Sequence, residues 1–207
     1  INSISFSPWR FLTSLSKRDW IILIVIVGCI LRVVWDAIFP SLPTSDAATY
    51  VDLGQKLSRG ETYFVGGTYA YWPPGYPFLL GVLYYFVGYS EAAMLALNIF
   101  IYGVTIWVVY GLAEHVLDDY SARVATVLLT IWPNHFMAAN GATKEYFLIP
   151  VLVGAVWLYL IAANSTRWKR IIPLVAGGMA LGYGALIQPG SMLFISAIII
   201  YALTCKT

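Results

Sequence analysis

The chain has 207 residues, of which 60% are hydrophobic and 11% are charged, with a formal net charge of +2 and a mean hydropathy of +0.76. Soluble domains are about a quarter charged and less than half apolar, so this composition excludes a soluble globular domain and predicts an all-α, polytopic membrane protein. The small net charge gives no support for a nucleic-acid partner, and Cys29 and Cys205 form neither a disulfide framework nor a metal-ligand spacing.

Six apolar runs are predicted to cross the membrane, because each approaches the roughly 20 residues that a spanning helix needs. They lie at about 20–39, 92–113, 122–139, 146–163, 171–187 and 191–204. A further run at 74–89 is the weakest of the series, because it is short and rich in tyrosine.

Positive charges indicate which segments lie inside the cell. Arginines and lysines within 10–18 place the N-terminus in the cytoplasm, and those within 164–170 place that loop on the same side. An even number of crossings must therefore separate the two segments, which excludes 74–89 as a span. We expect one long external loop over 40–91, with 74–89 as an interfacial or re-entrant helix.

A second interfacial helix is predicted at about 46–59 of this loop. Thr44 or Ser45 can cap its start, Gly60 suits its end, and its apolar side chains share one face. Asp46 opens this helix just outside the mouth of the first span. Its carboxylate either complements the helix dipole or acts as a general base at the water–lipid boundary. A single base suffices when the leaving group is a phosphate, since a phosphate needs little protonation to depart.

Two other features of the sequence have both a structural and a functional interpretation. Arg32 and Asp36 are four residues apart in the first span, so they can pair on one face, where intramembrane charges are either functional or steady the helix. The aromatic residues of 63–89, with Trp72 and Tyr76 in a proline-rich centre, form either an interfacial aromatic belt or a platform for a sugar ring or an isoprenoid chain.

Four sequence features occur in the order and spacing of a known superfamily. They are Asp46 followed by Tyr50, the PPGYP stretch at 73–77, the charged turn at 114–123 before the Pro133-containing span, and Glu145 at the start of the next span. In these features the chain resembles the GT-C membrane glycosyltransferases, in particular the group of protein O-mannosyltransferases and lipid A aminoarabinose transferases. The resemblance covers nearly the whole chain.

This resemblance implies roles for individual residues. Asp46 would be the catalytic base, and Glu145 would orient the acceptor or the donor. The alternative for Glu145 is a first-turn carboxylate beside Lys144, in a helix capped by Thr143. Relatives carry a basic residue where this chain has Gln188, which supplies no charge to the donor phosphate. That task would fall to Lys56, Arg59 or Lys144, or to a segment beyond the chain, while Tyr50, Trp72 and Tyr76 would contact substrate.

The function implied is that of an inverting glycosyltransferase in the plasma (inner) membrane. It would move a sugar from a polyprenyl-phosphate donor to a glycan, lipid or protein acceptor on the external side. The sequence assigns no cofactor and leaves a divalent metal open. Two other classes compete, namely a non-catalytic assembly subunit and a transporter or flippase of lipid-linked sugars. We interpret residues 1–207 as a single GT-C-like module, the N-terminal part of a longer enzyme.

Overall fold

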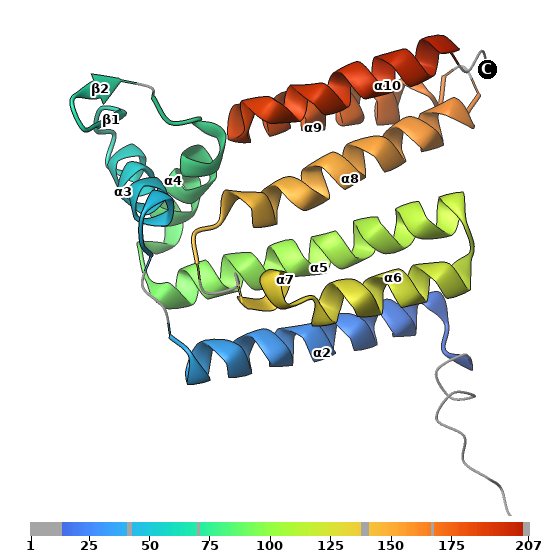
Figure 1. Cartoon of the computed structure of the whole chain (residues 1–207), viewed down its shortest axis with the longest axis horizontal. Helices are drawn as coiled ribbons and strands as arrows, with labels where there is room; N and C mark the ends of the chain where they lie inside the picture. Colours follow the sequence, from blue (N-terminus) through green and yellow to red (C-terminus); the bar gives the residue numbers. More distant parts are fainter. Residues whose placement is uncertain (1–13, 41–42, 70, 138–140, 167, 205–207) are drawn as a thin grey trace, which may run out of the picture.

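The fold was analysed in a computed structural model that describes residues 14–40, 43–69, 71–137, 141–166 and 168–204. The expected all-α class is confirmed within these residues, apart from one small hairpin, β1 (Phe64–Val65) with β2 (Thr68–Tyr69). The long helices lie side by side, and α3, α4 and the hairpin gather at one end of them (Figure 1).

Among the residues that the structure describes, three helices are long and apolar enough to cross a membrane, which makes the chain a multi-pass membrane protein. They are α2 (Lys17–Ile38), α5 (Glu91–Val116) and α8 (Lys144–Ala163). Serine side chains cap the first two, because Ser16 accepts from the amide of Asp19 and Ser90 from that of Ala93. The shorter apolar helices α9 (Ile171–Ile187) and α10 (Met192–Thr204) follow, with the 3-10 turn Pro189–Ser191 between them.

The predicted interfacial helices are present as helices of nearly the expected length. They are α3 (Asp46–Ser58) and α4 (Gly75–Val87). The two pack against each other through close contacts of Gly54 with Leu80 and of Gly81 with Leu57. Neither helix continues the row of long helices in Figure 1. Their location in the interface of a membrane stays a prediction.

Contacts between helix ends and the adjoining loops define one end of the row of long helices. At one end, Lys17 pairs with Glu114, Arg123 donates to the carbonyl of Leu15, and Asn164 contacts His115. The start of α2, the α5–α6 turn and the α8–α9 loop therefore share this end. The end of α2, the α3–α4 unit and the start of α8 lie at the other end (Figure 1). The assignment of these ends to the two sides of a membrane stays a prediction.

One expected span differs in the structure. The run 122–139 is divided into α6 (Asp119–Ile131) and the short α7 (Pro133–Met137). The division falls at Trp132, whose ψ of 117° is extended, in line with the preference of a residue before a proline for extended rather than helical geometry. Residues 138–140 lie outside the described part of the chain. At about 1.5 Å per residue, the 13 residues of α6 extend for only about 20 Å.

The expected pairing of Arg32 with Asp36 was wrong. The side chain of Arg32 is fully buried and points to other helices, where its Nε donates to the Tyr146 hydroxyl (2.8 Å) and its Nη2 contacts Nδ1 of His135 (2.7 Å). Its guanidinium also lies 3.6 Å from the centre of the Tyr102 ring. Three partners inside the bundle offer a guanidinium more hydrogen-bonding and aromatic contact than one carboxylate on an outer face.

Candidate functional site

The residues singled out as catalytic come together at the end of the bundle that carries α3. Asp46 is the first residue of α3, and Glu145 lies in the first turn of α8. The ammonium of Lys144 lies 4.0 Å from Glu145, and Asp46 lies near enough to exert a weaker electrostatic attraction on it. Lys144 also lies over the ring of Tyr50, 5.6 Å from its centre. The structure thus brings Asp46, Tyr50, Lys144 and Glu145 into one cluster.

The start of α3 holds Asp46 in an unusual local geometry. Ser45 occupies the N-cap position, as expected, but its side chain makes no capping hydrogen bond. Its φ of +52° lies in the left-handed region, where a residue other than glycine is strained by about 1–3 kcal/mol. Asp46 itself is exposed. The carboxylate is therefore accessible to a substrate and follows directly on a strained turn.

An aromatic wall stands beside this cluster and is formed by Tyr50, Trp72 and Tyr76. The ring of Tyr50 meets Trp72 edge-on at 5.5 Å and Tyr76 edge-on at 5.6 Å. The position of Trp72 is set by Tyr63, whose hydroxyl donates to the Trp72 carbonyl (2.9 Å). Burial raises the pKa of Tyr63 to about 12, so this phenol remains a donor. These contacts show that the aromatic residues are packed together rather than scattered along an interface.

Gln188 lies at the end of α9, close to the aromatic wall. The backbone of its neighbour Ile187 approaches Gly75 so closely that a Cβ at Gly75 would lie 2.7 Å from the Ile187 nitrogen. The hydroxyl of Tyr183 donates to the Gly75 carbonyl at 2.8 Å. The side-chain oxygen of Gln188 is buried and has no hydrogen-bond partner among the described residues. Gln188 thus stands near the cluster as a neutral group.

The other two candidate cations have partners elsewhere. Lys56 pairs with Asp52 (2.7 Å) and donates to the carbonyl of Phe64, while Arg59 pairs with Glu61 (2.6 Å). Both lie in the second half of α3 or beyond it, on the side away from Asp46. Of the three cations expected to meet a donor phosphate, the structure places Lys144 in the cluster.

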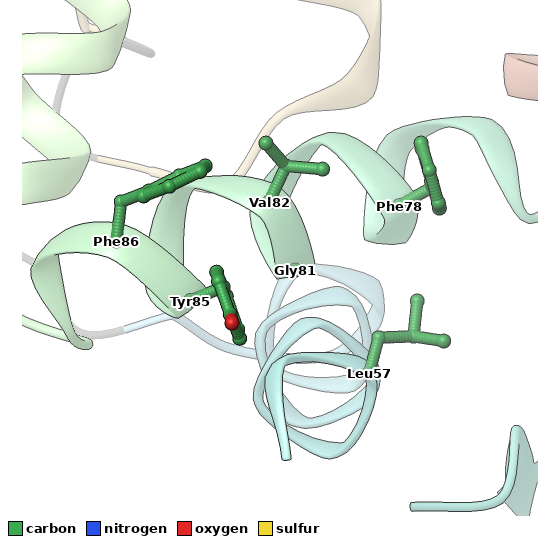
Figure 2. Close-up of a pocket in the computed structure, with 6 residues that line it drawn as sticks. All are labelled: Leu57, Phe78, Gly81, Val82, Tyr85 and Phe86. Carbon is green, nitrogen blue, oxygen red and sulfur yellow. The ribbon is translucent and has the colours of Figure 1, made fainter. Parts of the chain in front are cut away.

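Two cavities lie at this end of the molecule. One, of about 200 Å³, is an apolar groove between α3 and α4 that is lined by Leu57, Phe78, Gly81, Val82, Tyr85 and Phe86 (Figure 2). In a bilayer such a groove suits hydrocarbon chains. The second, of about 260 Å³, lies between α7 and the start of α8. Its wall includes Glu145 together with His135, Asn134 and Thr143.

Sequence reasoning singled out Arg32 but missed the two rings that it contacts behind the second cavity. His135 lies in α7, with 3% of its surface exposed, and stacks on Tyr146 with ring centres 4.4 Å apart. Arg32 contacts both rings. A signal for Arg32 was available, since a charge in an apolar span marks a functional candidate. No comparable signal exists for His135, because only the fold brings residues 32, 135 and 146 together.

Within the described residues, no group of three or more histidine, cysteine, aspartate or glutamate side chains could hold a metal ion. The arrangement offers one accessible carboxylate, one cation and a second carboxylate beside an aromatic wall. This set can remove a proton, stabilise negative charge and bind hydroxyl groups.

Comparison with protein families identifies the family to which the chain is similar. Residues 72–207, more than half of the chain, match the model of a family described as dolichyl-phosphate-mannose-protein mannosyltransferase. The matched region contains Lys144, Glu145 and Gln188, whereas Asp46 precedes it. Comparisons with curated proteins and with solved structures gave no match.

Proposed function

The chain belongs to the dolichyl-phosphate-mannose-protein mannosyltransferase family, and we propose that it transfers a sugar from a polyprenyl-phosphate donor to an acceptor on the outer face of the plasma membrane. The observation that carries this proposal is the convergence of Asp46, Lys144 and Glu145 at one end of the bundle. The family description points to mannose as the sugar and to protein as the acceptor. Glycan and lipid acceptors offer the same nucleophilic hydroxyl.

In this mechanism Asp46 is the general base. It takes the proton of the acceptor hydroxyl while the acceptor oxygen forms a bond to the anomeric carbon. The bond from that carbon to the phosphate oxygen breaks, and the lipid phosphate leaves with the electron pair. Attack from the face opposite the phosphate inverts the configuration. Asp46 suits the task because it is exposed and opens a helix, where a negative charge is favoured.

Lys144 is the group that we assign to the donor phosphate. The leaving phosphate gains negative charge as the bond breaks, so a cation at this point stabilises the transition state more than the ground state. Lys144 supplies the positive charge that Gln188 lacks, and its ion-pair contact with Glu145 is long, at 4.0 Å, so its ammonium can still meet a phosphate. Glu145 and the aromatic wall would then orient the reacting sugar.

The test is a transfer assay with the full-length protein in lipid nanodiscs, with polyprenyl-phosphate mannose as donor and peptide, glycan and lipid acceptors in parallel. Asp46→Asn should lower kcat about 100- to 10,000-fold, the range for loss of a general base. The matched control is Asp52→Asn, which removes an exposed carboxylate from the same helix but away from the cluster. Equal turnover of wild type and Asp46→Asn would remove Asp46 as base.

A non-catalytic assembly subunit is the second candidate, and the neutral Gln188 is the observation that favours it. This candidate predicts that the wild-type protein turns over none of the acceptors, while it still co-purifies with an active relative. A transporter has less support, because the deepest charge, Arg32, is held by neutral partners inside the bundle.

A further inference from the structure

We propose that Arg32 and Tyr146 are positioning residues for the transfer reaction. Their hydrogen bond ties the first turn of α8, which carries Lys144 and Glu145, to the helix that leads toward Asp46. The proposal rests on the transferase function above and adds to it two residues that act through the cluster without touching substrate. It follows from the way in which α8 begins, from the contacts of the Tyr146 hydroxyl and from the burial of the Arg32 charge.

The first turn of α8 lacks the side-chain cap that commonly fixes a helix start. Thr143 occupies the N-cap position, but its side chain makes no capping hydrogen bond. The preceding loop is held by Asn98, whose amide donates to the carbonyl of Gly141 at 3.1 Å. The two charged residues that open the helix are not buried, and their ion pair is long, at 4.0 Å. Tyr146 is the first buried side chain of α8, with 2% of its surface exposed, and it therefore fixes the direction in which this turn faces.

Tyr146 sets the direction of both charged side chains through the geometry of the helix. Successive residues of an α-helix point about 100° apart around its axis, because one turn holds 3.6 residues. Once Tyr146 points into the bundle, Glu145 and Lys144 are turned about 100° and about 200° away from it. A rotation or tilt of this turn moves both charges together relative to Asp46, which lies on a different helix. A contact that holds the Tyr146 ring therefore also holds the arrangement of the cation and the two acids.

The Tyr146 ring is held by residues of two other helices. Its hydroxyl accepts from Nε of Arg32 in α2 at 2.8 Å, and its face stacks on His135 of α7 with ring centres 4.4 Å apart. Nη2 of Arg32 contacts Nδ1 of the same histidine at 2.7 Å, and its Nη1 donates to the carbonyl of Gly28 at 2.9 Å. All three nitrogens of the guanidinium thus have partners, so neither the cation nor the tyrosine ring can turn without breaking a hydrogen bond.

The burial of the Arg32 charge indicates that orientation, rather than stability, is its main effect. The residue is fully buried, and among the described residues no carboxylate forms an ion pair with it. An apolar side chain of similar volume would be at least as stabilising in such surroundings. A planar guanidinium, by contrast, provides directed hydrogen bonds. Because α2 ends at Ile38 and α3 begins at Asp46, the bond to Tyr146 links the first turn of α8 to the helix that precedes the proposed base.

The experiment compares Tyr146→Phe with the matched control Tyr102→Phe in the full-length protein in nanodiscs. Each change removes one buried hydroxyl and keeps its ring, but the Tyr102 hydroxyl bonds to Ile24 of α2 and Thr130 of α6. In the transfer assay Tyr146→Phe should lower kcat about 10- to 100-fold, because a small misplacement of the reacting groups has an effect of this size. KM for the donor should change little, since the charge of Lys144 remains. Tyr102→Phe should lower Tm by a similar amount and leave kcat nearly unchanged.

A distance measurement reports the position of α8 without turnover. Spin labels are attached at Asp52→Cys, which is exposed in α3, and at Thr143→Cys, which directly precedes α8, in a background with both native cysteines replaced by alanine. Double electron–electron resonance then measures the distance between the two helices. Its distribution should be narrow in the otherwise unsubstituted protein and in Tyr102→Phe, and it should be broader or shifted in Tyr146→Phe.

Arg32→Lys gives an independent reading if Tyr146→Phe fails to fold. It keeps a charge but lacks the planar fork that reaches three partners, so the same distance distribution should broaden. Unchanged distributions in the folded variants, or an equal fall in kcat in Tyr146→Phe and Tyr102→Phe, would overturn the proposal. A broader distribution in Tyr146→Phe in a protein without turnover would refute the transferase function and support the positioning of α8. Turnover that depends on Asp46 together with unchanged distributions would refute the positioning alone.

Discussion

Gly28→Ala in α2 is predicted to destabilise the protein. A Cβ at this position would overlap the hydroxyl of Tyr102 and the ring carbons next to it. Tyr102 is fully buried, and its hydroxyl donates to the carbonyl of Ile24 (2.9 Å) while it shares a hydrogen bond with Thr130 (2.8 Å). The ring cannot move without breaking this link between α2, α5 and α6.

The magnitude follows from three contributions. Two lost hydrogen bonds cost about 1–3 kcal/mol together, and overpacking of a tight contact costs about 1–3 kcal/mol more. Alanine has the higher helix propensity and returns about 1 kcal/mol. The free energy of unfolding should therefore fall by about 3 kcal/mol, which for a chain of this size lowers Tm by about 6–12 °C.

Thermal unfolding in nanodiscs, followed by tryptophan fluorescence, measures the effect. The matched control is Gly103→Ala, which lies in α5 at the contact with α2 but meets only Val25 at 3.9 Å. This control should be neutral or slightly stabilising. The same Gly28→Ala change in a Tyr102→Leu background should cost much less, because the ring it strikes is gone. A similar loss in both backgrounds would contradict the proposed role of Tyr102.

Two other predictions concern the site. In the transfer assay, Lys144→Gln should raise KM for the lipid-phosphate donor and lower kcat by at least tenfold. The control Lys56→Gln should leave both constants within about twofold of the wild type. An equal effect of the two substitutions would remove Lys144 as the phosphate partner. Burial raises the pKa of Tyr63 to about 12, above the value near 10 of an unfolded tyrosine. The contribution of the neutral Tyr63 side chain to stability should therefore be complete below about pH 10 and be lost as the pH rises toward 12. Tyr63→Phe should lower the free energy of unfolding by about 1 kcal/mol at neutral pH, because the hydrogen bond to the Trp72 carbonyl is lost. The same variant should not show the alkaline loss of stability, and a loss of the same size in the variant would exclude Tyr63 as its cause.

Helix positions were largely predictable, because they depend on local sequence. The predicted 46–59 and 74–89 correspond to α3 and α4 within a few residues, and the prediction for 146–163 corresponds to α8. The exception is 122–139, where the apolar character continues through a proline that ends the helix. Hydropathy records the burial of side chains in lipid or protein and is insensitive to the backbone geometry that Pro133 imposes.

The site was predictable only in part, for a related reason. Asp46 and Glu145 lie at helix starts, which can be predicted from the sequence. In the fold both acids lie within electrostatic range of Lys144. Lys56 and Arg59 looked equally suitable as phosphate partners, but each pairs closely with a neighbouring acid, at 2.7 Å and 2.6 Å, whereas Lys144 lies 4.0 Å from Glu145. The closeness of the local ion pair, which the sequence does not show, decides which cation is available.

Arg32 shows why the interior of the site could not be foreseen. Among the described residues no carboxylate lies within ion-pair distance of its buried guanidinium, which is solvated by the carbonyl of Gly28, by Tyr146 and by His135. A buried charge of this kind adds little stability compared with an apolar side chain of similar volume. Its effect is orientation, since one rigid planar cation fixes the ring of α8 and the imidazole of α7 relative to α2. Arg32 therefore fixes the two rings that line the cavity between α7 and α8.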